Sequence, residues 1–312
     1  MNTIKLLDGG MGTLLRDKFN NKDQTLWSLN PYFHNKNDIN NAHKLFLDNG
    51  SDIIITNNYC ATPYYLKKKY NLDKINISTI ISDLGKIAYD LVQNYKNKAV
   101  FGSIPPYGES YNYNINVEKN EIIAHYETTF NSLYKYVDSF LCETIASLVE
   151  LNLLLELFNS NKELYYSKPI FFSFCVKYNG EKLLDNTDLS CVVNLLKKNG
   201  IRTLFFNCSP INYIDLAIKY INSLDKTIRI GVYPNKHEQT INNLDLEKIV
   251  VSDINYKDIH LDDFYDYCQN WINNYNVKFI GGCCGIDESY IGYVSKKMTT
   301  MDSCYKPSYT SN

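Results

Sequence analysis

The sequence has 312 residues, a formal net charge of −2 and 45% hydrophobic residues. The charge balance gives no electrostatic basis for binding nucleic acid, and no stretch approaches the roughly 20 apolar residues of a membrane-spanning helix. No long apolar run follows Met1–Lys5, so we expect no signal peptide and a cytoplasmic protein. Its nine cysteines would then be free thiols or metal ligands, because the cytosol keeps thiols reduced.

Eight short apolar runs recur along the chain, and a segment with helical spacing follows most of them. This alternation is typical of parallel β-α units. Eight units predict an α/β fold, a (β/α)8 TIM barrel, with one domain over residues 1–298 and a polar tail over 299–312; an open doubly wound sheet is the alternative. The runs are Ile4–Leu7, Asp52–Thr56, Ala99–Ser103, Val137–Cys142, Pro169–Val176, a run from Ile201 that ends in Asn207-Cys208, Ile228–Val232 and Val277–Ile280.

The segments between these runs carry apolar residues at near-helical spacing, and Gly50 and Gly200 are C-terminal stop signals. The stretch from Pro234 to Asp258 is the least regular part of the chain. The helical segments are Asp38–Gly50, Ser78–Tyr95, Glu121–Tyr136, Ile145–Phe158, Asp188–Gly200, Ile211–Leu224 and Leu261–Tyr275.

Two of the runs end in cysteine. The eighth is followed by two glycines, Cys283, Cys284 and a third glycine, and the sixth by Cys208. Three thiolates from two strand ends can hold one Zn2+ and leave its fourth position open, which is the pattern of catalytic zinc. The alternative is that cysteine acts as a small buried hydrophobe, which we expect for Cys60, Cys142, Cys175, Cys191, Cys268 and Cys304.

Two runs end in a carboxylate, Asp8 after the first and Glu143 after the fourth. In a barrel the strand ends meet at one mouth, so these side chains are expected beside the cysteines. A soft metal there suits a substrate sulfur, and the carboxylates suit a substrate cation such as an amino group. Helix capping and paired acid-base catalysis are the alternatives for Asp8 and Glu143. Gly9 and its neighbours would let the backbone pass close to a ligand.

The five histidines lie in predicted helices or loops, and we expect them to be surface or packing residues. A zinc hydrolase, which would favour histidine and carboxylate ligands, is therefore disfavoured. A barrel whose thiols bind zinc or switch redox state without turnover is the non-enzymatic alternative.

At this point the motifs resemble the homocysteine S-methyltransferase family over residues 4 to 295. The resemblance rests on the double cysteine with its glycines, Asn207-Cys208-Ser209-Pro210 and Glu143-Thr144, together with weaker motifs in order. The weaker motifs are Asp8-Gly9-Gly10-Met11-Gly12-Thr13, Trp27-Ser28, Gly102-Ser103-Ile104-Pro105-Pro106-Tyr107-Gly108 and Tyr233-Pro234-Asn235.

The resemblance implies a zinc barrel that methylates homocysteine to methionine. Cys208, Cys283 and Cys284 would bind the metal, and Asp8 and Glu143 would hold the amino group of homocysteine. The sequence departs from the family at Pro105, Asn58 and Lys236-His237, in loops that could shape the methyl-donor side.

The length leaves no room for folate or cobalamin domains, so we expect a small donor, S-methylmethionine or S-adenosylmethionine. Betaine, or another thiol or selenol acceptor, is the alternative. We expect Trp27, Tyr59 and Tyr107 to flank the cation of the donor. The substrates would be small molecules, and the oligomeric state stays open.

Overall fold

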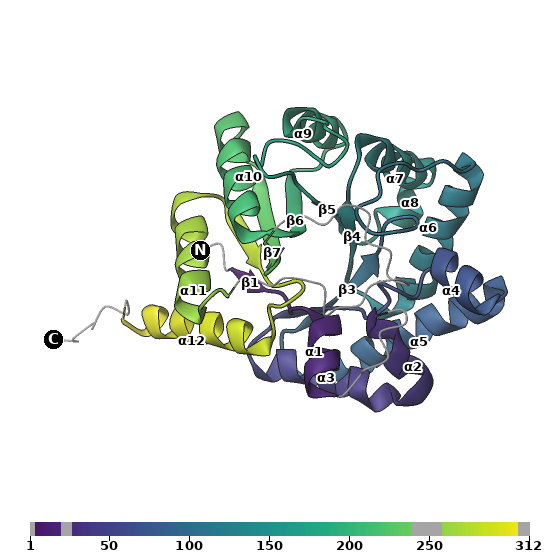
Figure 1. Cartoon of the computed structure of the whole chain (residues 1–312), viewed down its shortest axis with the longest axis horizontal. Helices are drawn as coiled ribbons and strands as arrows, with labels where there is room; N and C mark the ends of the chain where they lie inside the picture. Colours follow the sequence, from purple (N-terminus) through teal and green to yellow (C-terminus); the bar gives the residue numbers. More distant parts are fainter. Residues whose placement is uncertain (1–3, 20–26, 239–257, 305–312) are drawn as a thin grey trace.

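The computed structural model of the chain describes residues 4–19, 27–238 and 258–304. Within these ranges eight strands form one parallel sheet, and the helices surround it (Figure 1). The strands are β1 (Lys5–Leu6), β2 (Ile53–Ile55), β3 (Ala99–Ile104), β4 (Ser139–Ile145), β5 (Ile170–Phe174), β6 (Thr203–Pro210), β7 (Arg229–Asn235) and β8 (Val277–Ile280). Each coincides with a predicted apolar run, so the predicted (β/α)8 barrel is confirmed.

The predicted helices form with bounds that differ by a few residues. The helix expected from Ile145 begins at Leu148, because Ile145 belongs to β4 and the Ser147 hydroxyl caps the helix by accepting a hydrogen bond from Glu150 N. The predicted helices are α3 (Lys36–Asp48), α5 (Lys74–Val92), α6 (Lys119–Leu133), α7 (Leu148–Ser160), α9 (Leu189–Lys198), α10 (Ile211–Leu224) and α11 (Leu261–Asn274).

Further helices were not predicted: α1 (Met11–Lys18), α2 (Asn30–His34), α4 (Pro63–Tyr70), α8 (Lys162–Tyr165) and α12 (Glu288–Cys304), with the 3-10 turns η1 (Trp27–Leu29) and η2 (Tyr134–Tyr136). Helix α12 continues past residue 298, where the sequence placed the start of the tail. Residues 305–312 and most of the irregular stretch after Pro234 lie outside the described residues.

The interior of the barrel is filled by aromatic side chains. Phe101, Phe171, Phe205 and Phe279 come from four different strands, and the centroids of the rings in contact lie 5.0 to 6.4 Å apart. Large apolar residues normally fill such barrels in layers. This layer forms a solid floor, so a ligand can occupy only the space at the carboxyl ends of the strands.

The barrel closes between β1 and β2, which are the two ends of the hydrogen-bonded strand order β1-β8-β7-β6-β5-β4-β3-β2. Asp52 N donates to Leu6 O at 2.7 Å, and the Asp52 carboxylate accepts from Leu6 N at 3.0 Å. One step further along, Asp8 Oδ2 accepts from Ile55 N at 2.8 Å. Side-chain carboxylates therefore replace backbone acceptors across the seam between β1 and β2.

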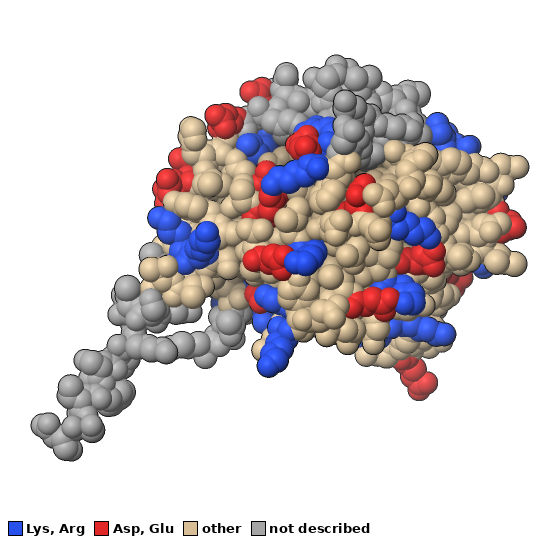
Figure 2. All heavy atoms as spheres, turned by 90° about the horizontal axis from the view of Figure 1, so that it is seen from below, with Lys and Arg blue, Asp and Glu red and all other residues tan. Residues whose placement is uncertain are grey.

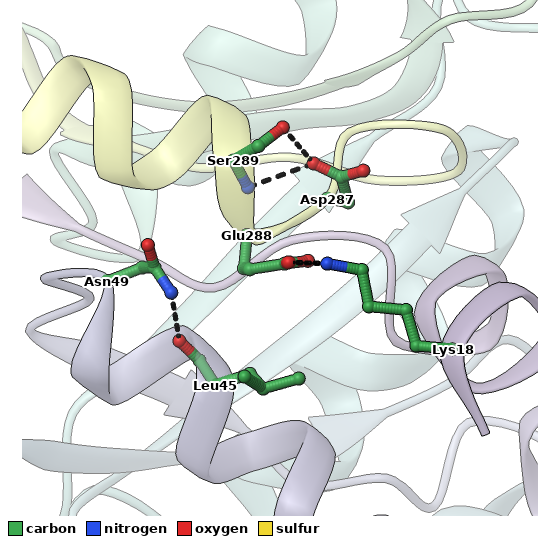
Figure 3. A network of polar contacts seen from close by, with 6 residues as sticks. All are labelled: Lys18, Leu45, Asn49, Asp287, Glu288 and Ser289. Atoms are coloured by element: carbon green, nitrogen blue, oxygen red, sulfur yellow. Dashed lines mark hydrogen bonds and ion pairs between the residues drawn. The ribbon is translucent and has the colours of Figure 1, made fainter.

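The first and last helices meet outside this seam (Figure 3). Lys18, in the last turn of α1, forms an ion pair with the buried carboxylate of Glu288, the first residue of α12. Asp287 caps α12 by accepting a hydrogen bond from Ser289 N at 2.9 Å. The contact fastens the N-terminal β-α unit to the C-terminal one.

The surface carries no single-sign patch on the face drawn in Figure 2, where basic and acidic side chains are interspersed. This agrees with the net charge of −2. Among the described residues, no helix is both long and apolar enough to span a bilayer.

The seam predicts different effects of two substitutions at Asp52. Asp52→Ala leaves Leu6 N without its acceptor, and an unsatisfied donor costs about 1–3 kcal/mol. Asp52→Asn keeps an acceptor oxygen and loses only the partly exposed ion pair with Lys98, which contributes about 0–1 kcal/mol. Urea unfolding of both variants measures the difference, and equal stabilities would show that the carboxylate does not close the seam.

Candidate active site

A cavity of about 900 Å³, which includes its opening to solvent, lies at the carboxyl ends of the strands. It is lined by residues near the carboxyl ends of β2, β4, β6 and β7 and by residues of the loops that follow β1, β2, β3, β7 and β8, as expected for the active end of a barrel. No lysine or arginine is among its described lining residues. The lining includes Asp8, Gly9, Trp27, Tyr59, Tyr111, Glu143, Cys208, Tyr233, His237, Cys283 and Cys284.

The three predicted cysteines come together at this cavity. Cys208 Sγ lies 2.6 Å from Cys283 Sγ, and Cys283 Sγ lies 4.0 Å from Cys284 Sγ. In a tetrahedral zinc site with Zn–S bonds of about 2.3 Å the sulfurs are about 3.8 Å apart. The donors therefore suit one zinc ion chemically, but Cys208 and Cys283 would have to separate by roughly 1 Å to hold it. Within the described ranges no group of three His, Cys, Asp or Glu side chains already has the spacing of a metal site.

The remaining cysteines divide differently from the prediction. Cys60, Cys142, Cys175 and Cys268 are buried, as expected of small hydrophobes, whereas Cys191 is exposed. The prediction was wrong for Cys191, which lies on the outer face of α9. It was based on the residue type alone and did not consider the position of the cysteine on the helix. The side chain of Cys304 is outside the described residues.

Both predicted carboxylates are buried in the cavity wall. Ser103 Oγ donates to Glu143 Oε1, and Tyr233 Oη donates to Glu143 Oε2 at 3.2 Å. Burial raises the pKa of Glu143 to about 7, and these hydrogen bonds only partly oppose the shift. Burial also raises the pKa of Asp8 well above its usual value, although the bond from Ile55 N lowers it. Two acids held away from water can accept a cationic group that neutralises them.

The aromatic residues divide between two places. Trp27 and Tyr59 line the cavity, as expected. Tyr107 does not: it lines a separate groove between α4 and α6, and its hydroxyl donates to Glu121 Oε1 at 2.7 Å. The structure therefore does not bring Tyr107 to the other candidate site residues. Tyr111 lies in the cavity instead and donates to Cys208 O at 3.1 Å.

Strained backbone conformations gather at the site. Trp27, Tyr111, Thr144 and Cys208 all have positive φ angles, between 48° and 65°. Non-glycine residues adopt this region at an energetic cost and mostly where the surroundings enforce it, often at functional sites. One enforcing contact is Asn207, whose side chain accepts from Thr144 N at 3.0 Å and donates to Thr144 Oγ1 at 2.9 Å.

The glycines near the N-terminus admit close packing. A side chain on Gly10 would collide with the backbone of Cys283, and one on Gly12 would collide with the indole of Trp27. Gly10 N also donates to Ile286 O at 2.8 Å. The glycine-rich stretch thus lets the first β-α loop pack against the double-cysteine loop, while Gly9 itself lines the cavity.

Comparison with known proteins agrees with this geometry. The family described as "Homocysteine S-methyltransferase" matches residues 5–298. The chain belongs to the homocysteine S-methyltransferase family. A homocysteine S-methyltransferase of Escherichia coli is 27% identical, covering 90% of this chain and 91% of its own. Homocysteine S-methyltransferase 1 of Arabidopsis thaliana is 25% identical, covering 94% and 93%.

A solved structure supports the fold. The metallated form of the homocysteine methyltransferase MmuM from Escherichia coli superposes with a TM-score of 0.78 at 24% sequence identity. The match covers 94% of this chain and 96% of that one. At this identity the likeness establishes the shared barrel.

Sequence reasoning missed several residues of this homocysteine S-methyltransferase site. Ser103 and Tyr233, which donate hydrogen bonds to Glu143, were not predicted as site residues. Both lie in recognised motifs near strand ends, so their positions in the sequence could have indicated that they belong to the site. His237 was expected to be a surface or packing residue; it is buried, at 4% exposed, and it also lines the cavity, which was not predicted. It lies two residues after Asn235, where β7 ends.

The raised pKa of Glu143 predicts a pH-dependent stability. The unfolded carboxyl group loses its proton near its ordinary pKa of 4.5, whereas the folded one keeps it until about pH 7. The wild-type protein should therefore lose up to about 3 kcal/mol of stability as the pH rises through this window. Glu143→Gln cannot ionise at this position, so it should not show this pH-dependent loss of stability and should be more stable than the wild type at pH 8.

Urea unfolding between pH 5 and 8.5 measures this difference, with the exposed Glu156→Gln as the matched control. A wild-type and a Glu143→Gln curve that run parallel over this range would contradict the assigned shift.

Proposed function

We propose that the protein transfers a methyl group from a small sulfonium donor to the thiol of homocysteine, giving methionine, with Zn2+ held by Cys208, Cys283 and Cys284. The observation that carries this proposal is that three thiols from two strand ends meet two buried carboxylates in one cavity. The names of the Escherichia coli and Arabidopsis relatives support the reaction.

The donor set supports zinc. Thiolate sulfur is a ligand type that zinc shares with few other biological metals, and three protein ligands leave a position for substrate. The related MmuM structure is described as a metallated form. When bound, zinc would lower the pKa of the homocysteine thiol so that its sulfur is held as a nucleophilic thiolate.

The carboxylates would hold the amino end of homocysteine. One oxygen of Asp8 accepts a hydrogen bond from Ile55 N, and Glu143 accepts hydrogen bonds from Ser103 and Tyr233. These bonds fix the orientation of both carboxylates. An ammonium group placed between them gains two charge-assisted hydrogen bonds in a site shielded from water. The amino acid is thereby oriented with its sulfur toward the cysteines.

The chemistry of the cavity favours a cationic donor. Its lining combines acids and thiols with Trp27 and Tyr59, whose rings attract a sulfonium through their faces. The homocysteine sulfur would attack the methyl carbon in line, and the carbon-sulfur bond of the donor would break with its electron pair leaving on a neutral thioether. S-methylmethionine and S-adenosylmethionine both fit this description. Betaine, a quaternary ammonium cation, is the alternative, as is a thiol or selenol acceptor other than homocysteine.

We further propose that residues 1–298 form the catalytic domain, followed by a C-terminal extension, and that the enzyme acts in the cytoplasm on small molecules alone. A barrel that binds zinc or oxidises its thiols without turnover is the alternative that the close pair Cys208 and Cys283 suggests. Turnover separates the two functions.

The direct test is methionine formation from homocysteine with each donor in turn, S-methylmethionine, S-adenosylmethionine and betaine. We expect turnover with a sulfonium, about one zinc per chain, and loss of both zinc and activity in Cys208→Ser, Cys283→Ser and Cys284→Ser. The exposed Cys191→Ser is the matched control and should keep both. Full zinc content in any of the three variants would overturn the ligand set, and methionine formation with none of the donors would overturn the reaction.

Homocysteine binding should release more than one proton per site at pH 7. One comes from the substrate thiol, and a further fraction comes from Glu143, which is about half protonated at its pKa of about 7 and must ionise to hold the ammonium. Glu143→Gln should release close to one proton and bind homocysteine more weakly, by a few kcal/mol. Calorimetry in buffers of different ionisation enthalpy counts the protons. Equal counts in the two proteins would remove Glu143 from the binding step.

A further inference from the structure

Asn58 follows the point where β2 ends and its neighbour β3 continues. Strand β2 ends at Ile55, which pairs with Phe101, whereas β3 extends to Ile104. Ser103 of β3 therefore lies beyond the last paired residue of β2, and it is buried. Because buried peptide groups need hydrogen-bond partners, the N–H and C=O of Ser103 must find theirs beyond the end of the β2 strand.

Two side chains of the loop after β2 supply these partners. Thr56 Oγ1 accepts from Ser103 N at 2.9 Å, and Asn58 Nδ2 donates to Ser103 O at 2.9 Å. The two side chains also bond to each other, because Thr56 Oγ1 donates to Asn58 Oδ1 at 2.5 Å. Thr56, Asn58 and Ser103 thus form a closed and buried ring of hydrogen bonds, which we call the β2–β3 ring.

Each donor and acceptor in the β2–β3 ring has only one assignment. A carbonyl oxygen can only accept, so the end of the Asn58 amide at Ser103 O is the NH2 group. The other end is the amide oxygen, which can also only accept. The Thr56 hydroxyl therefore donates its single proton to Asn58 and accepts from Ser103 N. An apolar side chain at position 58 would break two of these three bonds.

The β2–β3 ring lies between the two carboxylates of the cavity. With both of its peptide groups held, Ser103 directs its hydroxyl to Glu143 Oε1, to which it donates. On the other side, Ile55 N donates to Asp8 Oδ2 at 2.8 Å. The end of β2 is therefore bonded directly to one carboxylate and, through the ring, to the other.

We infer that Asn58 is a positioning residue for the acceptor substrate: through the β2–β3 ring it holds Ser103 on Glu143 and fixes the arrangement of the two carboxylates that bind the ammonium group. The inference rests on the function proposed above. Asn58 is not among the described residues that line the cavity, so it acts through its neighbours. Carboxylates joined by one strand end need little reorganisation when the ammonium group arrives, and such preorganisation favours binding.

The first measurement is the pKa of Glu143 in the protein without metal or substrate. Carbon-13 NMR of labelled glutamate carboxyl groups follows the titration, and the Glu143 signal is the one absent from Glu143→Gln. Asn58→Leu should weaken the hydrogen bond from Ser103 to the charged carboxylate and raise the pKa of Glu143 from about 7 by roughly 1. Glu150 is an internal control: burial raises its pKa to about 7 as well, but it accepts from Tyr126 and should titrate as before.

A double-variant cycle tests whether Asn58 acts through Ser103. Ser103→Ala removes the hydroxyl directly and should raise the pKa of Glu143 by a similar amount. Adding Asn58→Leu to Ser103→Ala should change this pKa no further, because no hydroxyl is left to direct. Thr56→Val breaks the ring at its other side chain and keeps the shape of the residue. It should give the same rise as Asn58→Leu, and it replaces that variant if Asn58→Leu does not fold.

The second measurement is homocysteine binding by the zinc-loaded protein. Calorimetry should give an affinity about tenfold lower in Asn58→Leu, as expected when a hydrogen bond to a charged group is misdirected, while the zinc content stays unchanged. Asn49→Leu is the matched control. Its amide also donates to a backbone carbonyl, Leu45 O at 2.9 Å, but it does not line the cavity, so homocysteine affinity should equal that of the wild type.

An unchanged pKa of Glu143 in Asn58→Leu and Thr56→Val would overturn the inference, whether or not the protein proves to be a methyltransferase. So would a further rise when Asn58→Leu is added to Ser103→Ala, or an unchanged homocysteine affinity despite a raised pKa. A wild-type protein that binds no homocysteine or makes no methionine would instead overturn the proposed function, and the NMR titration would still decide whether Asn58 holds Ser103 on Glu143. The two failures are therefore distinguishable.

Discussion

Closure of the barrel between β1 and β2 is the constraint on which the site depends. An open sheet would spread the strand ends along an edge, whereas a closed one brings the ends of β1, β4, β6 and β8 to a single rim. The seam is short of backbone hydrogen bonds, and carboxylates supply the missing acceptors. Asp8 belongs to both the seam and the cavity, because the residue whose carboxylate accepts from Ile55 N also lines the cavity.

The rim gathers features that each oppose folding. Glu143 and Asp8 are acids held out of water, Cys208 and Thr144 have strained backbone conformations, and thiols lie in close contact. Such features persist where the rest of the structure over-determines them. Here the support is the solid layer of phenylalanine rings below the cavity and the packed helices outside the barrel. A ligand cation and a metal would each relieve part of the opposing free energy, which links stability to binding.

Polar side chains beneath the reacting groups fix where those groups point. Asn207 joins β6 to Thr144 at the end of β4, and Ser173 of β5 donates to the same amide oxygen at 2.7 Å. Asn235 plays the corresponding part for His237 on the other side of the thiols. In both places an amide immediately before or near a site residue uses its two different ends to distinguish a donor from an acceptor. The amides therefore hold these neighbouring groups in place although neither amide lines the cavity.

The sequence by itself determined the eight strands, the barrel and the residues at the strand ends. A parallel strand is buried on both faces, so it can be recognised as a short apolar run. The polar residues at the carboxyl end of such a run lie at the rim of the barrel. This placed Asp8, Glu143, Cys208, Cys283 and Cys284 correctly in one cavity. Only the tertiary structure decided what loops bring to that rim. Tyr107 lines a separate groove, whereas Tyr111 and His237 line the cavity. The orientation of a loop side chain depends on contacts with segments that are distant in the sequence. The same holds for the pKa of Glu143, which depends on burial and on hydrogen bonds from Ser103 and Tyr233, two residues that are remote from it in the sequence.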